Sequence, residues 1–319
     1  MAQQFIYLSA DTLDGLGITA RESRDCIEEL VRGLDSEQVW AAPKSAMYIE
    51  DGRYFMATLA VATNPPVFAV KSLVLNAENL KRGLPQINGV VIVLDADTGL
   101  PLAIVDGNWV TAVRTAGLSA VAARHLARED SAVIGFIGCG VQAHSHLAAF
   151  SELYPIREIR AFGRGTANRD KLCTSAEARG LTAIASRSGQ EAIEDADIVV
   201  TSVTLSRETR PFLDAGGLKP GAFAAITDFA APWHREGMRA VDRIVVDDVA
   251  QENASGAPMV EPDLIKGDLR MLVNGKTAGR SGPEETTAFV FRGLAIGDLA
   301  LASLAWQKAH QVGAGTPIG

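Results

Sequence analysis

The sequence predicts an α/β protein in which a doubly wound parallel sheet is combined with a second, α+β domain. Three observations indicate this fold class. Short apolar runs alternate with helix-compatible segments from residue 130 to about 250, as in parallel sheets. A glycine pair lies between the first of these runs and a helix pattern. Before residue 108, two turn signals between strand patterns favour an antiparallel arrangement.

The first 108 residues are expected to form one helix and two hairpins. Residues 19–22, Thr-Ala-Arg-Glu, have the spacing of a capping box and precede an amphipathic helix pattern that reaches Leu34. Residues 45–63 read as two strands joined at Asp51-Gly52, and residues 89–107 repeat this plan around positions 95–99. These elements predict a largely antiparallel sheet.

Two long helix patterns separate this region from the rest of the chain. Residues 110–127 are rich in alanine and free of proline, and residues 286–312 have an apolar stripe through Leu294, Leu299 and Leu304. The second pattern is expected to return to the first domain. We therefore predict one domain from residues 1–118 with 294–319, and a nucleotide-binding domain from residues 119–293.

Composition limits the possible partners. The 319-residue chain has a formal net charge of −8 and no extended basic face, so nucleic acid and anionic membranes are poor partners. Cys26, Cys139 and Cys173 are widely separated, which favours neither a disulfide framework nor a metal site and suits a reducing compartment. The sequence also lacks a signal-peptide pattern and a membrane-spanning apolar run. We expect a cytoplasmic protein that acts on small molecules without a metal.

The glycine pair belongs to a motif with a known mechanism. Residues 138–143, Gly-Cys-Gly-Val-Gln-Ala, fit the pattern G-x-G-x-x-G/A between a strand and a helix, which is typical of Rossmann-type dinucleotide binding. Gly138 would allow the tight turn, Gly140 the close approach of a pyrophosphate, and Ala143 close packing of helix and sheet. The alternative is a tight turn in a fold that binds no nucleotide.

The end of the next predicted strand bears on the choice of cofactor. It reads Gly163-Arg164-Gly165-Thr166, with no acidic residue before Asp170 to bind a ribose 2′-hydroxyl group. The Arg164 guanidinium group suits a 2′-phosphate. We therefore expect NADP(H) rather than NAD(H), although Arg164 could instead be a solvated loop residue with NAD(H) held by other groups.

Three polar residues stand in apolar surroundings. Lys71 interrupts a strand-like run, Arg114 lies in the alanine-rich helix pattern, and Asp228 ends a predicted parallel strand, where such folds bind ligands. Each has a structural alternative. Lys71 could extend its amine to solvent, Arg114 could pair with a structural carboxylate, and Asp228 could cap the next turn.

Taken together, these segments resemble the ornithine cyclodeaminase/μ-crystallin family over nearly the whole chain. The resemblance is carried by residues 67–99, 106–127, 133–147 and 279–302, and by the strand end at Asp228. It implies a homodimer. It also implies an N-terminal domain, completed by the C-terminal helix, that dimerises and supplies the substrate pocket, and a Rossmann domain that holds NAD(P)(H).

The resemblance also implies residue roles. Lys71 and Arg114 match positions that bind a substrate carboxylate, Lys44 stands where an arginine is usual, and Asp228 with Lys71 would be catalytic. Met56 and Gly293 complete the predicted substrate-binding set. The predicted cofactor-binding residues, from motif and resemblance together, are Arg114, Thr115, Gly138, Gly140, Val141, Gln142, Ala143, Gly163, Arg164, Thr166, Thr201, Ser202 and Val203.

Two departures from the family pattern bear on the substrate. Residues 291–293 read Phe-Arg-Gly where a small serine is common, so the pocket or the nicotinamide contact is expected to differ. Residues 54–56 read Tyr-Phe-Met where a diamino-acid substrate would need an acidic residue, and Glu50 and Asp51 fall at the hairpin turn. A compact or cyclic apolar substrate is favoured.

The hypothesis from the sequence is an NADPH-dependent reductase of an α-imino acid, such as Δ1-pyrroline-2-carboxylate. Two other enzyme classes stay open: an ornithine cyclodeaminase with bound NAD, and an amino-acid dehydrogenase similar to alanine dehydrogenase. A non-enzymatic alternative is an NADPH-binding protein of the μ-crystallin kind.

Overall fold

One helix, α3 (Gly107–Leu126), connects the two structural units of the chain. The computed structural model describes residues 4–204 and 209–319, so the first three residues of the N-terminal stretch lie outside the described part. Unit 1 comprises residues 1–114 and 294–319, and unit 2 comprises residues 115–293. The division falls between Arg114 and Thr115, whereas the sequence places it after residue 118 of the same helix.

Unit 1 is built on a mixed sheet with the strand order β16-β1-β7-β6-β5-β4-β2, and β3 pairs with β4. Both predicted hairpins are present: β3 pairs antiparallel with β4, and β6 with β7. The β1–β7 pair is parallel. The strands are β1 (Phe5–Leu8), β2 (Val39–Ala41), β3 (Ser45–Tyr48), β4 (Tyr54–Thr63), β5 (Pro66–Leu75), β6 (Ile87–Asp95), β7 (Pro101–Asp106) and β16 (Thr316–Ile318).

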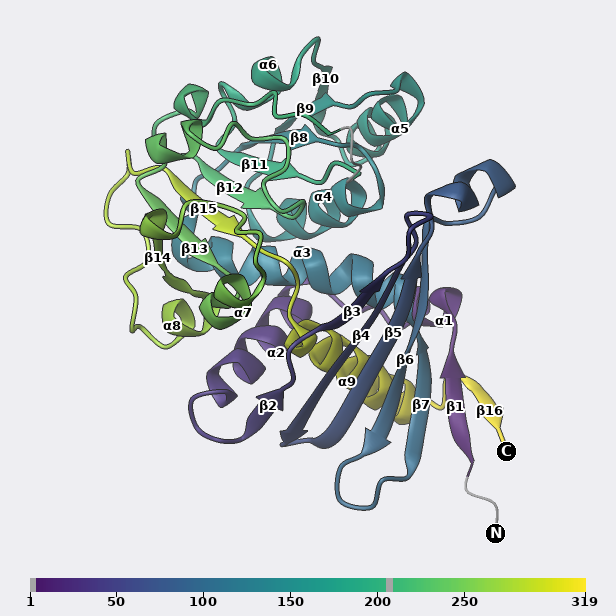
Figure 1. Ribbon diagram of the computed structural model, residues 1–319. Helices are drawn as coiled ribbons and strands as arrows, with labels where there is room; N and C mark the ends of the chain where they lie inside the picture. Colours follow the sequence, from purple (N-terminus) through teal and green to yellow (C-terminus); the bar gives the residue numbers. More distant parts are fainter. Residues whose placement is uncertain (1–3, 205–208) are drawn as a thin grey trace. The chain divides into compact units, whose positions relative to one another are not determined.

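Helices cover one face of this sheet. Figure 1 shows α9 (Ala295–Val312) lying along β4, β5, β6 and β7, and α9 also packs against α2 (Ala20–Gly33). The predicted capping box is confirmed, because the Thr19 hydroxyl group accepts from the Glu22 amide and the Glu22 carboxylate accepts from the Thr19 amide. The remaining helices of unit 1 are α1 (Ala10–Gly15) and η1 (Ala77–Arg82).

Unit 2 contains a parallel sheet with the strand order β10-β9-β8-β11-β12-β15-β13-β14. The first strand of the unit, β8, lies inside the sheet, with later strands added on both sides; this is the Rossmann order. The predicted fold class is therefore confirmed. The strands are β8 (Val133–Ile137), β9 (Glu158–Phe162), β10 (Thr182–Ala185), β11 (Ile198–Thr201), β12 (Phe223–Ile226), β13 (Arg243–Val246), β14 (Ile265–Asp268) and β15 (Thr287–Val290).

One prediction about the C-terminal part is wrong. Residues 286–312 read as a single helix, but Thr287–Val290 form β15, between β12 and β13, and the helix begins at Ala295. All four residues of β15 are buried, so burial on both faces of a parallel strand removes the alternation that would identify it. Gly293, with a φ of 103°, separates this strand from α9.

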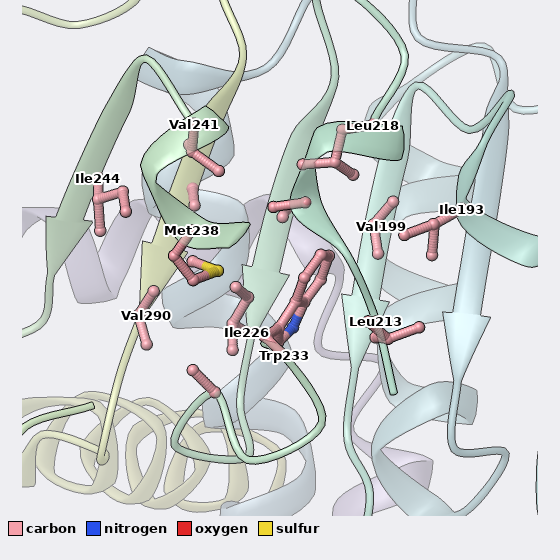
Figure 2. Close-up of a cluster of buried hydrophobic side chains, with 14 of the residues drawn as sticks. Ile193, Val199, Leu213, Leu218, Ile226, Trp233, Met238, Val241, Ile244 and Val290 are labelled. Carbon is pink, nitrogen blue, oxygen red and sulfur yellow. The ribbon is translucent and has the colours of Figure 1, made fainter. Parts of the chain in front are cut away.

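One apolar cluster packs against the later strands of unit 2. Ile226 and Val290 from β12 and β15 pack with Trp233, Met238 and Ile244 in one cluster (Figure 2). The helices of this unit are α4 (Val141–Leu153), α5 (Thr166–Glu177), α6 (Gly189–Ile193), α7 (Val249–Ala254), α8 (Leu269–Val273), η2 (Ala215–Gly217), η3 (Gly237–Ala240) and η4 (Pro262–Leu264). Across residues 4–204 and 209–319, no helix has the length and apolarity required to cross a bilayer.

Candidate active site

A row of polar residues crosses the covered face of the unit 1 sheet. Thr58 of β4 pairs with Lys71 of β5, and both are buried. Ser45 pairs with Ala57, so continuing this register by one residue places Lys44 beside Thr58. Lys71 is 1% exposed, which rules out the alternative in which its amine extends to solvent. Met56 is buried two residues before Thr58, on the same face of β4.

Asp298 is the negatively charged partner of this row. The Lys71 Nζ atom donates to Asp298 Oδ1 at 2.6 Å, and the Thr58 hydroxyl group donates to Oδ2 at 3.0 Å. The Arg114 Nε atom lies 3.2 Å from the same Oδ1 atom, an ion pair without hydrogen-bond alignment. We call Lys71, Arg114, Thr58 and Asp298 the cation cluster.

The cation cluster carries more positive than negative charge, since two cations share one carboxylate. Burial and, after it, the Arg114 charge lower the pKa of Lys71 to about 8, although Asp298 opposes both effects. Lys71 therefore keeps its proton at neutral pH. A net positive cluster of this kind is suited to a carboxylate.

Sequence reasoning missed Asp298, although a signal was present. Residues 294–305 are apolar except for Asp298 and Ser303, so a single carboxylate interrupts a buried helix just as Lys71 interrupts a buried strand. A pairing across 227 residues cannot be read from one sequence. Residues 54–56 are Tyr-Phe-Met, so they contribute no carboxylate to this cluster. Tyr54 instead has its pKa raised to about 12, mainly by burial.

In unit 2, the glycine motif forms the turn between β8 and α4. Gly138 has a φ of 92°, and its amide donates to the Phe162 carbonyl group at 2.9 Å. A Cβ atom on Gly138 would lie 2.6 Å from the Ser202 carbonyl oxygen, so only glycine fits beside the residue that follows β11. Gly140 is the N-cap of α4 and makes no side-chain cap hydrogen bond.

This turn fits a dinucleotide pyrophosphate. A Cβ atom on Gly140 would meet nothing within 4 Å, so the backbone there is open to close approach. The N-cap Gly140 provides no side-chain cap, and a helix N-terminus of this kind favours an anion. In that turn Val141 is 68% exposed, Gln142 is partly buried, and Ala143 is fully buried against the sheet.

The turn after β9 lies beside the glycine motif. Gly163, Arg164 and Thr166 lead into α5, and a Cβ atom on Gly163 would lie 3.4 Å from the Cys139 Sγ atom. Arg164 is exposed. Burial raises the pKa of the Cys139 thiol to about 12, which makes a reactive thiolate unfavourable at neutral pH.

Asp228 lies just beyond the end of β12 and holds the segment after β11. Its Oδ1 atom accepts from the Thr201 hydroxyl group at 2.9 Å, and its Oδ2 atom accepts from the Val203 amide at 2.9 Å. Ser202, between them, donates to the Gly138 carbonyl group at 3.4 Å. Burial raises the pKa of Asp228 to about 7, although both hydrogen bonds lower it.

The predicted site residues therefore gather in two groups, one in each unit. Lys71, Arg114 and Met56 gather in unit 1, while Thr201, Ser202, Val203 and Asp228 gather with Gly138 in unit 2. Thr115 is buried at the start of unit 2. Gly293 lies apart, with its amide bonded to Asp247 Oδ2 at 2.8 Å.

The departure at residues 291–293 has a structural explanation. Phe291 is buried and stacks on Phe289, with ring centroids 4.8 Å apart. The Arg292 Nε atom donates to Glu252 at 2.8 Å, and its guanidinium group lies over the Phe229 ring. In the described ranges, 4–204 and 209–319, no cluster of His, Cys, Asp and Glu could hold a metal ion.

This fold and these two groups of residues define a two-unit α/β protein with a Rossmann-type nucleotide-binding sheet. The chain belongs to the ornithine cyclodeaminase/mu-crystallin family, whose model matches residues 13–313. The resemblance inferred from the sequence is thus confirmed.

Three relatives illustrate the range of this similarity. The ketimine reductase mu-crystallin of Rattus norvegicus is 33% identical over 229 residues, 70% of this chain and 71% of the relative. The Delta(1)-pyrroline-2-carboxylate reductase of Thermococcus litoralis, solved with NADH and L-proline, superposes with a TM-score of 0.89 at 28% identity. That match covers 98% of this chain and 100% of the other. An archaeal alanine dehydrogenase dimer with bound NAD has a TM-score of 0.88 at 26% identity, covering 99% of both chains.

Proposed function

We propose that the protein is an NAD(P)H-dependent reductase of α-imino acids and acts on a cyclic ketimine such as Δ1-pyrroline-2-carboxylate. The observation that carries the proposal is the buried cation cluster, in which Lys71 and Arg114 share the single carboxylate of Asp298. A dinucleotide-binding turn in the same chain supports a redox reaction. Relatives named for ketimine and pyrroline-2-carboxylate reduction support the substrate class.

The cation cluster would anchor the substrate carboxylate. Arg114 offers a planar fork that matches the two oxygens of a carboxylate, and its Nε atom lies 3.2 Å from Asp298 Oδ1. Lys71 adds a second positive charge at Asp298 Oδ1. Lys44, next to Thr58 in the sheet register, is a point charge where the family pattern has a fork. Met56 supplies an apolar wall, which suits a ring better than a second amine.

Reduction of the C=N bond requires a hydride at carbon and a proton at nitrogen. A reduced nicotinamide, when bound at the glycine turn, supplies the hydride. Lys71 holds the proton: its ammonium group has a pKa of about 8, close to the operating pH, which is favourable for a general acid. Fixing the substrate by its carboxylate makes the transfer effectively intramolecular.

In this proposal Asp228 positions neighbouring residues of unit 2 and does not transfer the proton. Both of its oxygens already accept hydrogen bonds within unit 2, and its side chain is 2% exposed. It holds Thr201, Ser202 and Val203 at the carboxyl edge of the sheet, where the nicotinamide half of a dinucleotide would bind. The proton transfer is assigned to Lys71 rather than to Asp228.

NADP(H) is the proposed cofactor preference. Arg164 is exposed at the carboxyl end of β9, and no acidic residue precedes Asp170 in this turn. A guanidinium group there favours a 2′-phosphate over a free ribose hydroxyl group.

The proposed assembly is a homodimer formed through the unit 1 sheet. Leu59, Val70, Ile92 and Ile104 follow one another across β4, β5, β6 and β7. Because side chains alternate along a strand, this apolar row lies on the face opposite to Lys71 and α9. Leu59 is 42% exposed and Ile92 37%, and such a continuous apolar row is typical of an interface. A dimeric alanine dehydrogenase among the relatives supports this assembly.

The test is a spectrophotometric screen at 340 nm with NADPH and NADH. Cyclic ketimine carboxylates, open 2-oxo acids with amines, and diamino acids are compared. We expect nucleotide oxidation with a cyclic ketimine carboxylate, and at least a hundredfold loss of kcat/KM in Lys71→Met with dinucleotide binding retained. Ammonia release from a diamino acid without net nucleotide change would identify a cyclodeaminase instead. Inactivity on the whole panel despite tight nucleotide binding would identify a binding protein.

A further inference from the structure

A single carboxylate oxygen, Asp298 Oδ1, contacts both cations of the cation cluster. Asp298 Oδ1 lies 2.6 Å from Lys71 Nζ and 3.2 Å from Arg114 Nε, while Oδ2 accepts from the Thr58 hydroxyl group at 3.0 Å. The three charged side chains are 0%, 10% and 4% exposed for Lys71, Arg114 and Asp298. One oxygen therefore bridges two cations away from water.

Lys71 and Arg114 repel each other because both are positively charged, and removal from water disfavours the charged form of both. The bridging carboxylate offsets these costs for the two cations at once. Asp298 lies in the first turn of α9, where a helix N-terminus stabilises a negative charge. The C-terminal segment of the chain thereby supplies the counter-charge for cations that lie on β5 and α3.

We propose that Asp298 is a positioning residue for imine reduction: it keeps the Lys71 ammonium group protonated and fixed beside Arg114. This inference rests on the proposed function, since Lys71 is the group assigned to the proton. Asp298 need not touch the substrate. It influences the reaction by controlling the protonation and position of Lys71.

The groups around Lys71 differ in whether they favour its charged or its neutral form. Thr58 faces it from β4, Thr111 and Arg114 from α3, Asp298 from α9, and Lys44 acts on it from the residue before β3. Within the part of the chain that the structure describes, Asp298 is the negative group of this set. Without its charge, burial, Arg114 and Lys44 all favour the neutral amine of Lys71.

The test is a titration of Lys71 by ¹³C NMR of lysine ε-carbons, with the resonance assigned by its absence in Lys71→Arg. Asp298→Asn is expected to lower the Lys71 midpoint by at least about one pH unit. The matched control, Thr58→Val, removes an uncharged contact of the same carboxylate and is expected to shift the midpoint by less than about 0.5 unit. An unchanged or raised midpoint in Asp298→Asn overturns the proposal.

A second measurement needs no substitution at Asp298. In the wild-type protein the carboxyl ¹³C resonance of Asp298 should show an inflection at the Lys71 midpoint, and Lys71→Arg should remove it. The absence of that inflection also overturns the proposal, even if Asp298→Asn does not fold.

The pH dependence of kcat/KM provides a kinetic test of the Asp298 charge. The alkaline limb of kcat/KM for the imine should move to lower pH in Asp298→Asn together with the NMR midpoint, whereas a purely structural defect would lower activity without moving the limb. If the wild-type protein reduces no imine, the proposed function fails, and the NMR titration still decides the role of Asp298.

Discussion

At the scale of single residues, the two buried ionisable groups differ in how they are stabilised. Lys71 has a charged partner in Asp298, whereas the partners of Asp228 among the described residues are the neutral donors Thr201 and Val203. A buried carboxyl group without a cation shifts toward its protonated form. Between these two pKa values, about 3.8 in the unfolded chain and about 7 in the folded protein, Asp228 is therefore protonated when folded and ionised when unfolded.

This difference predicts a pH-dependent effect of Asp228→Asn on stability. The pKa of Asp228 is raised from 3.8 to about 7, so its contribution to stability is present below about pH 4 and is lost as the pH rises through 7. Asparagine has no such loss. We expect the unfolding free energy of the variant, relative to wild type, to increase by at least about 1 kcal/mol between pH 5 and pH 8. Urea unfolding at both pH values measures it, and parallel stability of the two proteins would contradict the raised pKa.

Arg164 carries the prediction about cofactor choice. Removal of a charge-assisted contact to a 2′-phosphate costs about 1.5 kcal/mol or more, so Arg164→Ala should weaken NADPH binding about tenfold and leave NADH binding nearly unchanged. Arg169→Ala is the matched control, because Arg169 lies on α5 and pairs with Asp170. Nucleotide titrations by fluorescence measure both. An unchanged NADPH/NADH ratio in Arg164→Ala would reject the assignment of Arg164.

At the scale of elements, the β8–α4 turn combines a folding requirement with a binding one. Gly138 has a positive φ, and a Cβ atom at this position would lie 2.6 Å from a backbone oxygen. Gly140 has a φ of −88°, which any residue adopts, and open space at its Cβ position. The fold thus requires glycine at position 138, whereas a requirement for glycine at position 140 would come from the bound ligand.

A pair of alanine substitutions separates these constraints. Gly138→Ala should destabilise the fold by more than about 2 kcal/mol, because both strain and a backbone clash oppose it. Gly140→Ala should change stability by less than about 0.5 kcal/mol and weaken dinucleotide binding at least about tenfold, because only a bound pyrophosphate would meet the new methyl group. Thermal unfolding and nucleotide titration provide the two readouts. Full nucleotide affinity in Gly140→Ala would place the pyrophosphate elsewhere.

The elements also show what the sequence could predict. The hairpins, the capping box at Thr19 and the glycine turn follow from local signals, and the structure contains them. The strand β15 could not be recognised, because Thr287–Val290 run directly into the apolar pattern of α9 and are buried on both faces. Asp298 was visible as an isolated charge, but its partners come from β4, β5 and α3 and depend on the fold.

At the scale of the whole molecule, the apolar row on the unit 1 sheet predicts self-association. Ile92→Lys should place a charge in the row and convert a dimer into monomers. Ile184→Lys is a matched control, since Ile92 and Ile184 are both isoleucines on strands, of β6 and β10, with 37% exposure. Analytical ultracentrifugation of both variants and the wild type measures the mass. A dimer that survives Ile92→Lys, or a monomeric wild type, would contradict the proposed interface.

We propose that one chain combines a carboxylate-binding cation cluster with a dinucleotide turn in order to reduce a C=N bond. The most direct measurement uses NADPH carrying deuterium at the transferable position of C4, together with Δ1-pyrroline-2-carboxylate, and reads the product by mass spectrometry. We predict proline with one deuterium at Cα for each nucleotide oxidised, and almost none with Lys71→Met. Proline without deuterium, or a nucleotide that stays reduced while the imine is supplied in excess, would contradict direct hydride transfer to this imine.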